Sequence, residues 1–276
     1  MKKYIIKFLT SIFLFSSSIG VTFAAGENYA IGSRSAGMGR SSVAITDFWS
    51  AMNNQAGMAK FTKPMVGIYY ESRFLLNELS SKSIAGLLPT KYGVFAATYN
   101  HFGYELYNDQ KIGLAYARAF GDKIRIGLQL DYLQTKLGNN YGTKGNVTFE
   151  IGIQTDINQN FTIGAWVFNP IMVKLAEFDD EKLPAIYKLG FAWHISDIFL
   201  ATVEAEKSTA INPIIFRGGI EYELNKRFFF RTGFSTNKEI FSFGMGIVIK
   251  YLRFNISTIM HESLGFSPQA SLIFEF

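Results

Sequence analysis

The chain has 276 residues, a formal net charge of +5, 48% hydrophobic and 16% aromatic residues, three histidines and no cysteine. The lack of cysteine excludes disulfides and thiolate metal sites, and three histidines leave little for an imidazole cluster. Three of the 27 basic residues lie within the first seven positions, so 24 basic residues face 22 acidic ones in the remainder, a near-neutral balance that argues against nucleic-acid binding.

Residues 1–24 have the pattern of a secretory signal peptide. A basic start precedes an apolar run at 8–15, and small residues close the segment near Ala24. A retained anchor helix is the alternative, but three serines interrupt the short apolar run. We therefore expect cleavage after Ala24 or Ala25.

Residues 25–62 form a second segment, rich in Gly, Ser and Ala and without the alternation of a strand. A short helix is predicted at 48–52, with Thr46 or Asp47 as its N-cap. Small residues would let this backbone pack closely against a surrounding wall. Arg34 and Asp47 carry charges that could pair with charges on that wall.

From residue 63 to 276 the sequence alternates between apolar and polar positions, as strands do. In the clearest strand, 123–135, every second residue is Ile, Leu or Tyr, whereas Arg125 and Asp131 lie on the other face. Fourteen strands are predicted, near 64–74, 81–88, 91–101, 110–120, 123–135, 146–156, 160–169, 185–195, 198–206, 213–224, 227–235, 240–250, 251–260 and 268–276.

Two features favour a membrane barrel over a soluble β-sandwich, which would also alternate. The apolar faces carry bulky residues with aromatics near the strand ends, and the opposite faces combine glycine with charge. Short turns also alternate with longer loops, predicted near 101–110, 136–146, 170–184, 206–213 and 260–267. The predicted fold class is all-β: a transmembrane antiparallel β-barrel of about 14 strands at 63–276, with a short N-terminal hatch segment.

Three short runs in the second segment resemble a known family. They are G-S-R-S-A-G-M-G at 32–39, S-V-A-I-T-D at 42–47 and N-Q-A-G-M-A at 54–59. The pattern is similar to the PorV/PorQ branch, from Bacteroidota, of the FadL superfamily of outer-membrane proteins, although Gln55 stands where that branch usually has Pro and Met58 where it has Leu. The resemblance implies that residues 25–62 form a hatch inside the barrel in the cell outer membrane; a purely structural plug is the alternative.

The candidate site residues fall into two sets. The hatch set is Arg34, Gly37, Gly39, Asp47, Asn54, Gln55 and Gly57. The lumen set is Arg125, Asp131, Glu150, Arg217, Glu221 and Arg231, with Lys188, His194, Glu204 and Arg253 on the same inward parity. Their mixed signs favour a network of ion pairs across the interior, which is a structural role, over a wide aqueous pore.

A lateral gate is a further hypothesis, because Gly86, Pro89 and Gly93 interrupt the second and third predicted strands. An irregular strand without a gate is the alternative. The resemblance adds that a kinked early strand opens a side exit in the FadL transporter.

Three functions remain open from the sequence. The first is passive uptake of a hydrophobic small molecule, with inward Tyr69, Trp166, Phe168 and Phe229 as an apolar lining. The second, implied by the resemblance, is an accessory barrel for protein secretion or surface attachment, with secretion-system proteins as partners. The third is a structural barrel. We find no nucleotide, phosphate-loop or metal motif, so we expect no enzyme, no cofactor and no metal, and the lipid bilayer as a partner.

Overall fold

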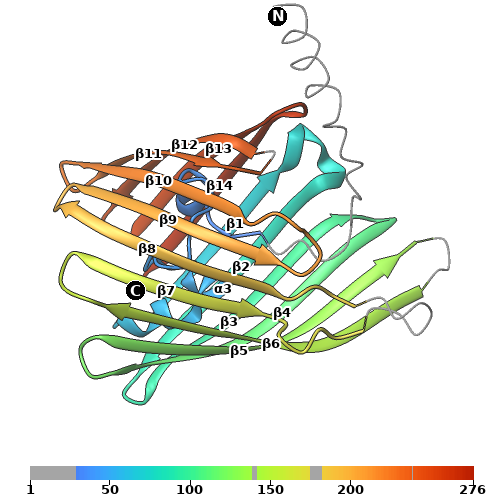
Figure 1. Cartoon of the computed structure of the whole chain (residues 1–276), viewed down its shortest axis with the longest axis horizontal. Coiled ribbons are helices and arrows are strands. Elements are labelled where there is room, and N and C mark those ends of the chain that lie inside the picture. Colours follow the sequence, from blue (N-terminus) through green and yellow to red (C-terminus); the bar gives the residue numbers. More distant parts are fainter. Residues whose placement is uncertain (1–28, 139–141, 175–181, 238) are drawn as a thin grey trace, which may run out of the picture.

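The computed structural model describes residues 29–138, 142–174, 182–237 and 239–276, and the predicted signal peptide lies outside them. The described residues form fourteen strands that close into one antiparallel barrel, in which each strand pairs with its sequence neighbours and β1 pairs with β14 (Figure 1). The strands are β1 (Met65–Ser72), β2 (Ser80–Thr90), β3 (Gly93–Tyr104), β4 (Tyr107–Phe120), β5 (Ile124–Leu137), β6 (Gly142–Asp156), β7 (Phe161–Phe168), β8 (Ile186–Ser196), β9 (Phe199–Ser208), β10 (Ile215–Leu224), β11 (Phe228–Ser235), β12 (Glu239–Ile249), β13 (Leu252–His261) and β14 (Gly265–Glu275).

The two faces of the wall differ as the alternation predicts. Along β5, Leu128 and Leu130 are exposed on the outside, whereas Gln129 and Asp131 are buried inside. An exposed apolar surface around a whole closed barrel is what lipid contact requires, because water would penalise it. Among the described helices, none is long and apolar enough to cross a membrane.

The barrel has two unlike ends. At the first, which we call the turn end, the C-terminus lies near short connections such as Thr90 to Gly93. An aromatic girdle is exposed at this end, as expected at a membrane–water interface: it consists of Tyr92, Phe120, Trp193, Phe199, Phe228, Tyr251 and Phe276. The opposite end, which we call the loop end, includes the two 3₁₀ turns η2 (Arg73–Leu75) and η3 (Asn77–Leu79) and the long connection between β7 and β8.

Three of the five predicted long loops are wrong. The one predicted near 260–267 is a turn of residues 262–264 between β13 and β14. β3 and β4 are joined by Glu105 and Leu106 alone, and the ladder between β5 and β6 continues to the pair Leu137 and Gly142. The cause is that backbone pairing between strands continues beyond the apolar belt, where the side chains no longer alternate. The third predicted loop, at 170–184, matches the connection between β7 and β8, of which residues 175–181 lie outside the described part.

The structure gives no support to a gate at β2 and β3. Their pairing is uninterrupted from Ser81 opposite Phe102 to Thr90 opposite Gly93. Pro89 lies beyond the last pair that β2 makes with β1, at Leu87, so its missing N–H removes no hydrogen bond on that side. Register shifts occur elsewhere, between β8 and β9 and between β12 and β13.

Residues 29–64, which we call the inner segment, pass through the barrel (Figure 1): almost all of 30–58 is buried inside it, whereas Lys60 and residues 62–64 are exposed where the segment meets β1. The segment contains α2 (Ser33–Ala36), α3 (Ser50–Asn53) and the 3₁₀ helix η1 (Gln55–Lys60). The predicted N-cap was wrong, because Trp49 occupies that position of α3 and makes no side-chain cap. Tyr29 contacts Arg73 near the loop end, and Lys63 pairs with Glu275 at the turn end. The segment therefore runs the length of the lumen.

Apolar side chains of the inner segment pack in two places. Phe48, Trp49 and Met52 join a buried cluster with residues of β1–β4 and β14. Val43 and Ala44 join a second cluster with residues of β7–β9. These clusters sit on opposite sides of the segment and hold it against the wall by burial of apolar area.

Candidate functional site

The centre of the candidate site is the carboxylate of Glu221 on β10. Arg34 of the inner segment donates from Nε and Nη2 to its two oxygens at 2.9 and 2.6 Å. Arg231 on β11 donates from Nε to the same carboxylate at 2.5 Å. One buried acid therefore joins the segment to the wall through charge-assisted hydrogen bonds.

Asp47 lies at the edge of this cluster. Its carboxylate is 4.0 Å from Arg34 Nη1, so it pairs within the inner segment. Burial raises the pKa of the Asp47 carboxyl above its ordinary value, and the charge of Arg34 offsets part of the rise. The cluster holds predicted residues from both sets: Arg34, Asp47, Glu221 and Arg231.

A second junction surrounds Glu150 on β6. Gln55 donates from Nε2 to Oε2 at 2.5 Å, and Trp166 Nε1 donates to the same oxygen at 3.1 Å. Lys111 Nζ lies 2.6 Å from Oε1. Beside this junction, Asn54 Nδ2 donates to the carbonyls of the strands β6 and β7 at 3.3 Å. Gln55 of the predicted hatch set and Glu150 of the predicted lumen set are thus in direct contact.

The predicted glycines of the inner segment make close backbone approaches. Gly39 has φ +67 and its N–H donates to Ser242 Oγ at 2.8 Å, and an added Cβ would lie 2.3 Å from the carbonyl oxygen of Phe234. At Gly37 an added Cβ would lie 3.0 Å from Gly244 on β12. Gly57 differs, because its close neighbour is Ser50 of the same segment.

The remaining predicted lumen residues bind mainly to the wall. Arg125 pairs with Asp156, which also pairs with Lys60 of the inner segment at 2.8 Å. Asp131 accepts from Gln129 at 2.7 Å, and Arg217 pairs with Glu206. These ion pairs therefore join neighbouring strands along the wall, whereas the mixed signs predicted a network across the interior.

Sequence reasoning missed three junctions. Arg40 is fully buried and pairs with Glu71 on β1. Glu204 Oε2 accepts from the backbone N–H groups of Ser42 and Val43 at 2.7 and 2.8 Å. Gln154 donates to the carbonyl of Val43 at 3.0 Å. The strand alternation predicts that Glu71, Glu204 and Gln154 point into the lumen. It does not predict which residues of the inner segment they contact.

Glycines on the wall also receive the inner segment. Gly127, Gly152, Gly164, Gly219 and Gly233 each have an atom of the segment within 2.4 Å of where a Cβ would be. Five different strands therefore lack a side chain where the segment passes. The sequence shows these glycines at positions that face the lumen. It does not show that the inner segment passes there.

A cavity of about 320 Å³ lies between the inner segment and the turn end. Arg34, Asp47 and Trp49 line it from the segment. The wall contributes both charged and apolar groups, among them His194, Glu223, Phe229, Arg253 and Ile273. Of the four aromatics expected to line an apolar pocket, Phe229 lies here, whereas Tyr69, Trp166 and Phe168 are buried in the two apolar clusters.

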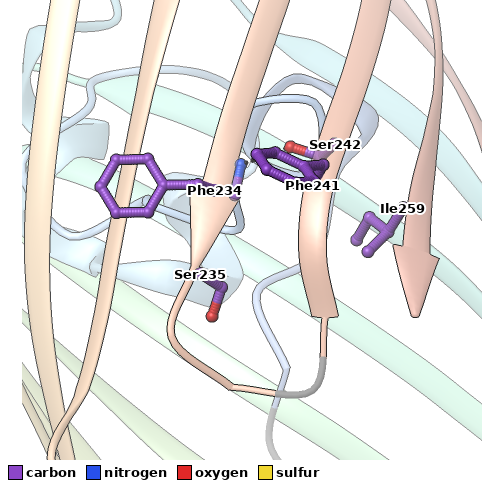
Figure 2. Close-up of a pocket in the computed structure, with 6 residues that line it drawn as sticks. Phe234, Ser235, Phe241, Ser242 and Ile259 are labelled. Atoms are coloured by element: carbon purple, nitrogen blue, oxygen red, sulfur yellow. Dashed lines mark hydrogen bonds between the residues drawn. The ribbon is translucent and has the colours of Figure 1, made fainter. Parts of the chain in front are cut away.

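A second, narrower crevice lies in the wall where Gly39 meets β11 and β12 (Figure 2). Its lining includes Ser235, Ser242 and Ile259, together with Phe234 and Phe241, whose side chains are exposed on the outside. It leaves no room for a water molecule. The wall is therefore sealed at this point.

Among the described residues, no group of three or more His, Asp and Glu side chains could hold a metal ion. His261 accepts hydrogen bonds through Nδ1 from the N–H groups of Ser263 and Leu264, so it stabilises the turn between β13 and β14. Its ring also packs edge-on against Phe74 of η2, with centroids 5.1 Å apart, so its contacts in the described structure are structural.

The geometry defines a class: a closed fourteen-stranded barrel whose lumen holds an inner segment of its own chain. Solved transporter and channel barrels share this fold. The toluene transporter TbuX of Ralstonia pickettii aligns with TM-score 0.66 and 12% identity over 90% of this chain and 98% of its own. The toluene transporter TodX of P. putida gives 0.63 and 11% over 91% and 99%. A FadL homologue of Pseudomonas aeruginosa gives 0.60 and 10% over 89% and 97%.

No family model matches the sequence. No curated protein matches it either. At 10–12% identity the structural likeness establishes the fold, and the PorV/PorQ resemblance remains a prediction from the three short runs.

Proposed function

We propose that this chain is an outer-membrane barrel that lets small apolar molecules pass, with residues 25–62 as the hatch of its lumen. The observation that carries the proposal is the inner segment itself, which fills a closed barrel of the fold found in hydrocarbon transporters. A general porin needs an open aqueous lumen, which this segment occupies. The exposed apolar surface and the predicted signal peptide support the outer-membrane location.

The driving force would be transfer of apolar area from water to protein and then to the membrane, at about 25 cal/mol per Å². This needs no reaction and no cofactor. The hatch would have to shift, and the polar junctions at Glu221, Glu150 and Glu204 are the contacts it would break. The cavity at the turn end offers space directly beside the Glu221 junction, because Arg34, Glu221 and Arg231 all line it.

The second candidate is the accessory barrel for secretion or surface attachment that the PorV/PorQ resemblance implies. The density of buried contacts around the inner segment favours it, because a permanently closed barrel needs no moving hatch. Its partners would contact the loop end.

Native mass spectrometry of the detergent-purified barrel with oleate and with N-phenyl-1-naphthylamine tests the choice. The uptake proposal expects adducts on the wild type that are lost when residues 29–62 are deleted. Glu275→Gln, which alters exposed ion pairs at the turn end, is the matched control and should keep its adducts. A barrel free of adducts in every form would overturn the uptake proposal and favour the accessory role.

A further inference from the structure

Three residues on the outside of the barrel form a polar row near the loop end. Tyr70 on β1 lies directly opposite Lys82 on β2, and Lys82 lies directly opposite His101 on β3. Directly opposite residues in antiparallel strands share a face, with Cβ atoms about 5 Å apart. Tyr70 and Lys82 are exposed and His101 is half-buried. The row therefore faces the surroundings of the barrel.

The outward positions of the strands β1–β4 include Lys82 and no acid; the exposed acids at this end, Glu78 and Glu105, lie in the connections between the strands. The two acidic residues of these strands, Glu71 and Asp109, have inward parity and bind inward partners. Within the described part of the chain, Lys82 makes no hydrogen bond or ion pair. Lys207, exposed at the end of β9 near the loop end, differs because its ammonium donates to the carbonyls of Ile211 and Asn212.

An apolar surface continues from the polar row towards the turn end. Ile68 opposite Ile84 forms the next outward pair, with exposed fractions of 53% and 47%. Leu88 opposite Phe95 lies further along, and both are exposed. A cationic group directly above an exposed apolar strip matches a lipid, whose anionic headgroup lies directly above its acyl chains.

We propose that the outward face of β1–β3 binds one phosphate-bearing membrane lipid, with Lys82 and His101 at its headgroup and Ile68, Ile84, Leu88 and Phe95 along its acyl chains. Lys82 donates to the phosphate, and Tyr70 contacts the interface beside it. The surface is continuous with the apolar belt already assigned to lipid. The proposal rests on membrane insertion and is independent of uptake.

The test is native mass spectrometry of the full chain in detergent with dioleoyl phosphatidic acid and, separately, dioleoylglycerol. These lipids differ by the phosphate alone. In the mass spectrum, the wild-type protein should keep phosphatidic acid bound, whereas dioleoylglycerol should dissociate from it. Lys82→Gln should weaken retention about fivefold, the effect of one interfacial cation, and Lys82→Gln with His101→Gln should weaken it further.

Lys207→Gln is the matched control, because it removes a cation near the same end whose ammonium is already bonded to carbonyls. It should retain phosphatidic acid as the wild type does. Equal retention by wild type and Lys82→Gln, or equal retention of the two lipids, would overturn the proposal. Inorganic phosphate alone should not compete, and if it does, the site recognises free phosphate and the lipid assignment is wrong. None of these results tests the uptake of apolar ligands, so the two proposals can fail separately.

Discussion

At Glu221, two guanidinium groups share one carboxylate, and they come from different parts of the molecule. Arg34 belongs to the inner segment and Arg231 to the wall. The Glu221 side chain is 7% exposed, so water screens the pairs little. Removing the acid would take its ionic partner from Arg231, whose side chain is 3% exposed, and would leave Arg34 with the longer pair to Asp47 at 4.0 Å. A buried cation without its acid costs more than the pair contributes.

Glu221→Gln should therefore loosen the inner segment, by about 3 kcal/mol of docking free energy. Trypsin cleavage after Arg34 and Arg40, followed by mass spectrometry, measures release, since both bonds are protected in the docked segment. Cleavage should become faster while the barrel keeps its β-sheet circular dichroism.

Glu275→Gln provides the comparison at the same scale. Its partners Lys63 and Arg253 are about half exposed, so their pairs contribute at most about 1 kcal/mol. Equal cleavage rates in the two variants would contradict the assignment of Glu221 as the junction.

At the scale of the elements, the strands follow directly from the sequence. A period of two marks a strand wherever one face meets lipid and the other meets the lumen, and this holds along β5 and β12. The alternation ends where the strands extend beyond the lipid-facing belt. The sequence therefore did not predict the parts of β3–β6 that lie beyond this belt. Pairing there depends on backbone groups that every sequence carries.

The inner segment was predictable as a unit and unpredictable in detail. Gly-rich composition and the lack of alternation set residues 25–62 apart, but no periodicity gives the partner of Arg40 or of Ser42. Those contacts depend on which strand of a closed barrel lies across the lumen. The sequence places Glu71 and Glu204 on inward faces, and only the closed fold brings them to Arg40 and Ser42.

The wall glycines give a prediction at this scale. At Gly233 on β11, an added Cβ would lie 2.1 Å from the backbone nitrogen of Gly39. Gly233→Ala should therefore push the segment away from β11, at a cost of about 1–3 kcal/mol. The trypsin assay at Arg34 reports the displacement as faster cleavage.

Gly86→Ala on β2 is the matched control, because the nearest atom to its added Cβ is the carbonyl oxygen of Met65 at 4.0 Å. Cleavage of this variant should match the wild type. An unchanged rate in Gly233→Ala would mean that the segment yields at Gly39 without leaving the wall.

For the whole molecule, the decisive property is that a fourteen-stranded lumen contains its own chain. A barrel of this size lies between filled eight-stranded and open sixteen-stranded barrels, so its lumen would conduct ions if it were empty. The inner segment fills it through two apolar clusters and the polar junctions between them. A cavity of about 320 Å³ lies on one side of the segment and is lined by charged groups of both signs.

The wild type should therefore show no steady ion current in a planar bilayer, whereas the variant without residues 29–62 should conduct. Glu221→Gln should give brief openings, since it loosens one junction and leaves both apolar clusters in place. This variant keeps the test informative if the deletion fails to insert. Steady current through the wild type would show that the segment leaves a continuous aqueous path, and the lumen would then act as a pore.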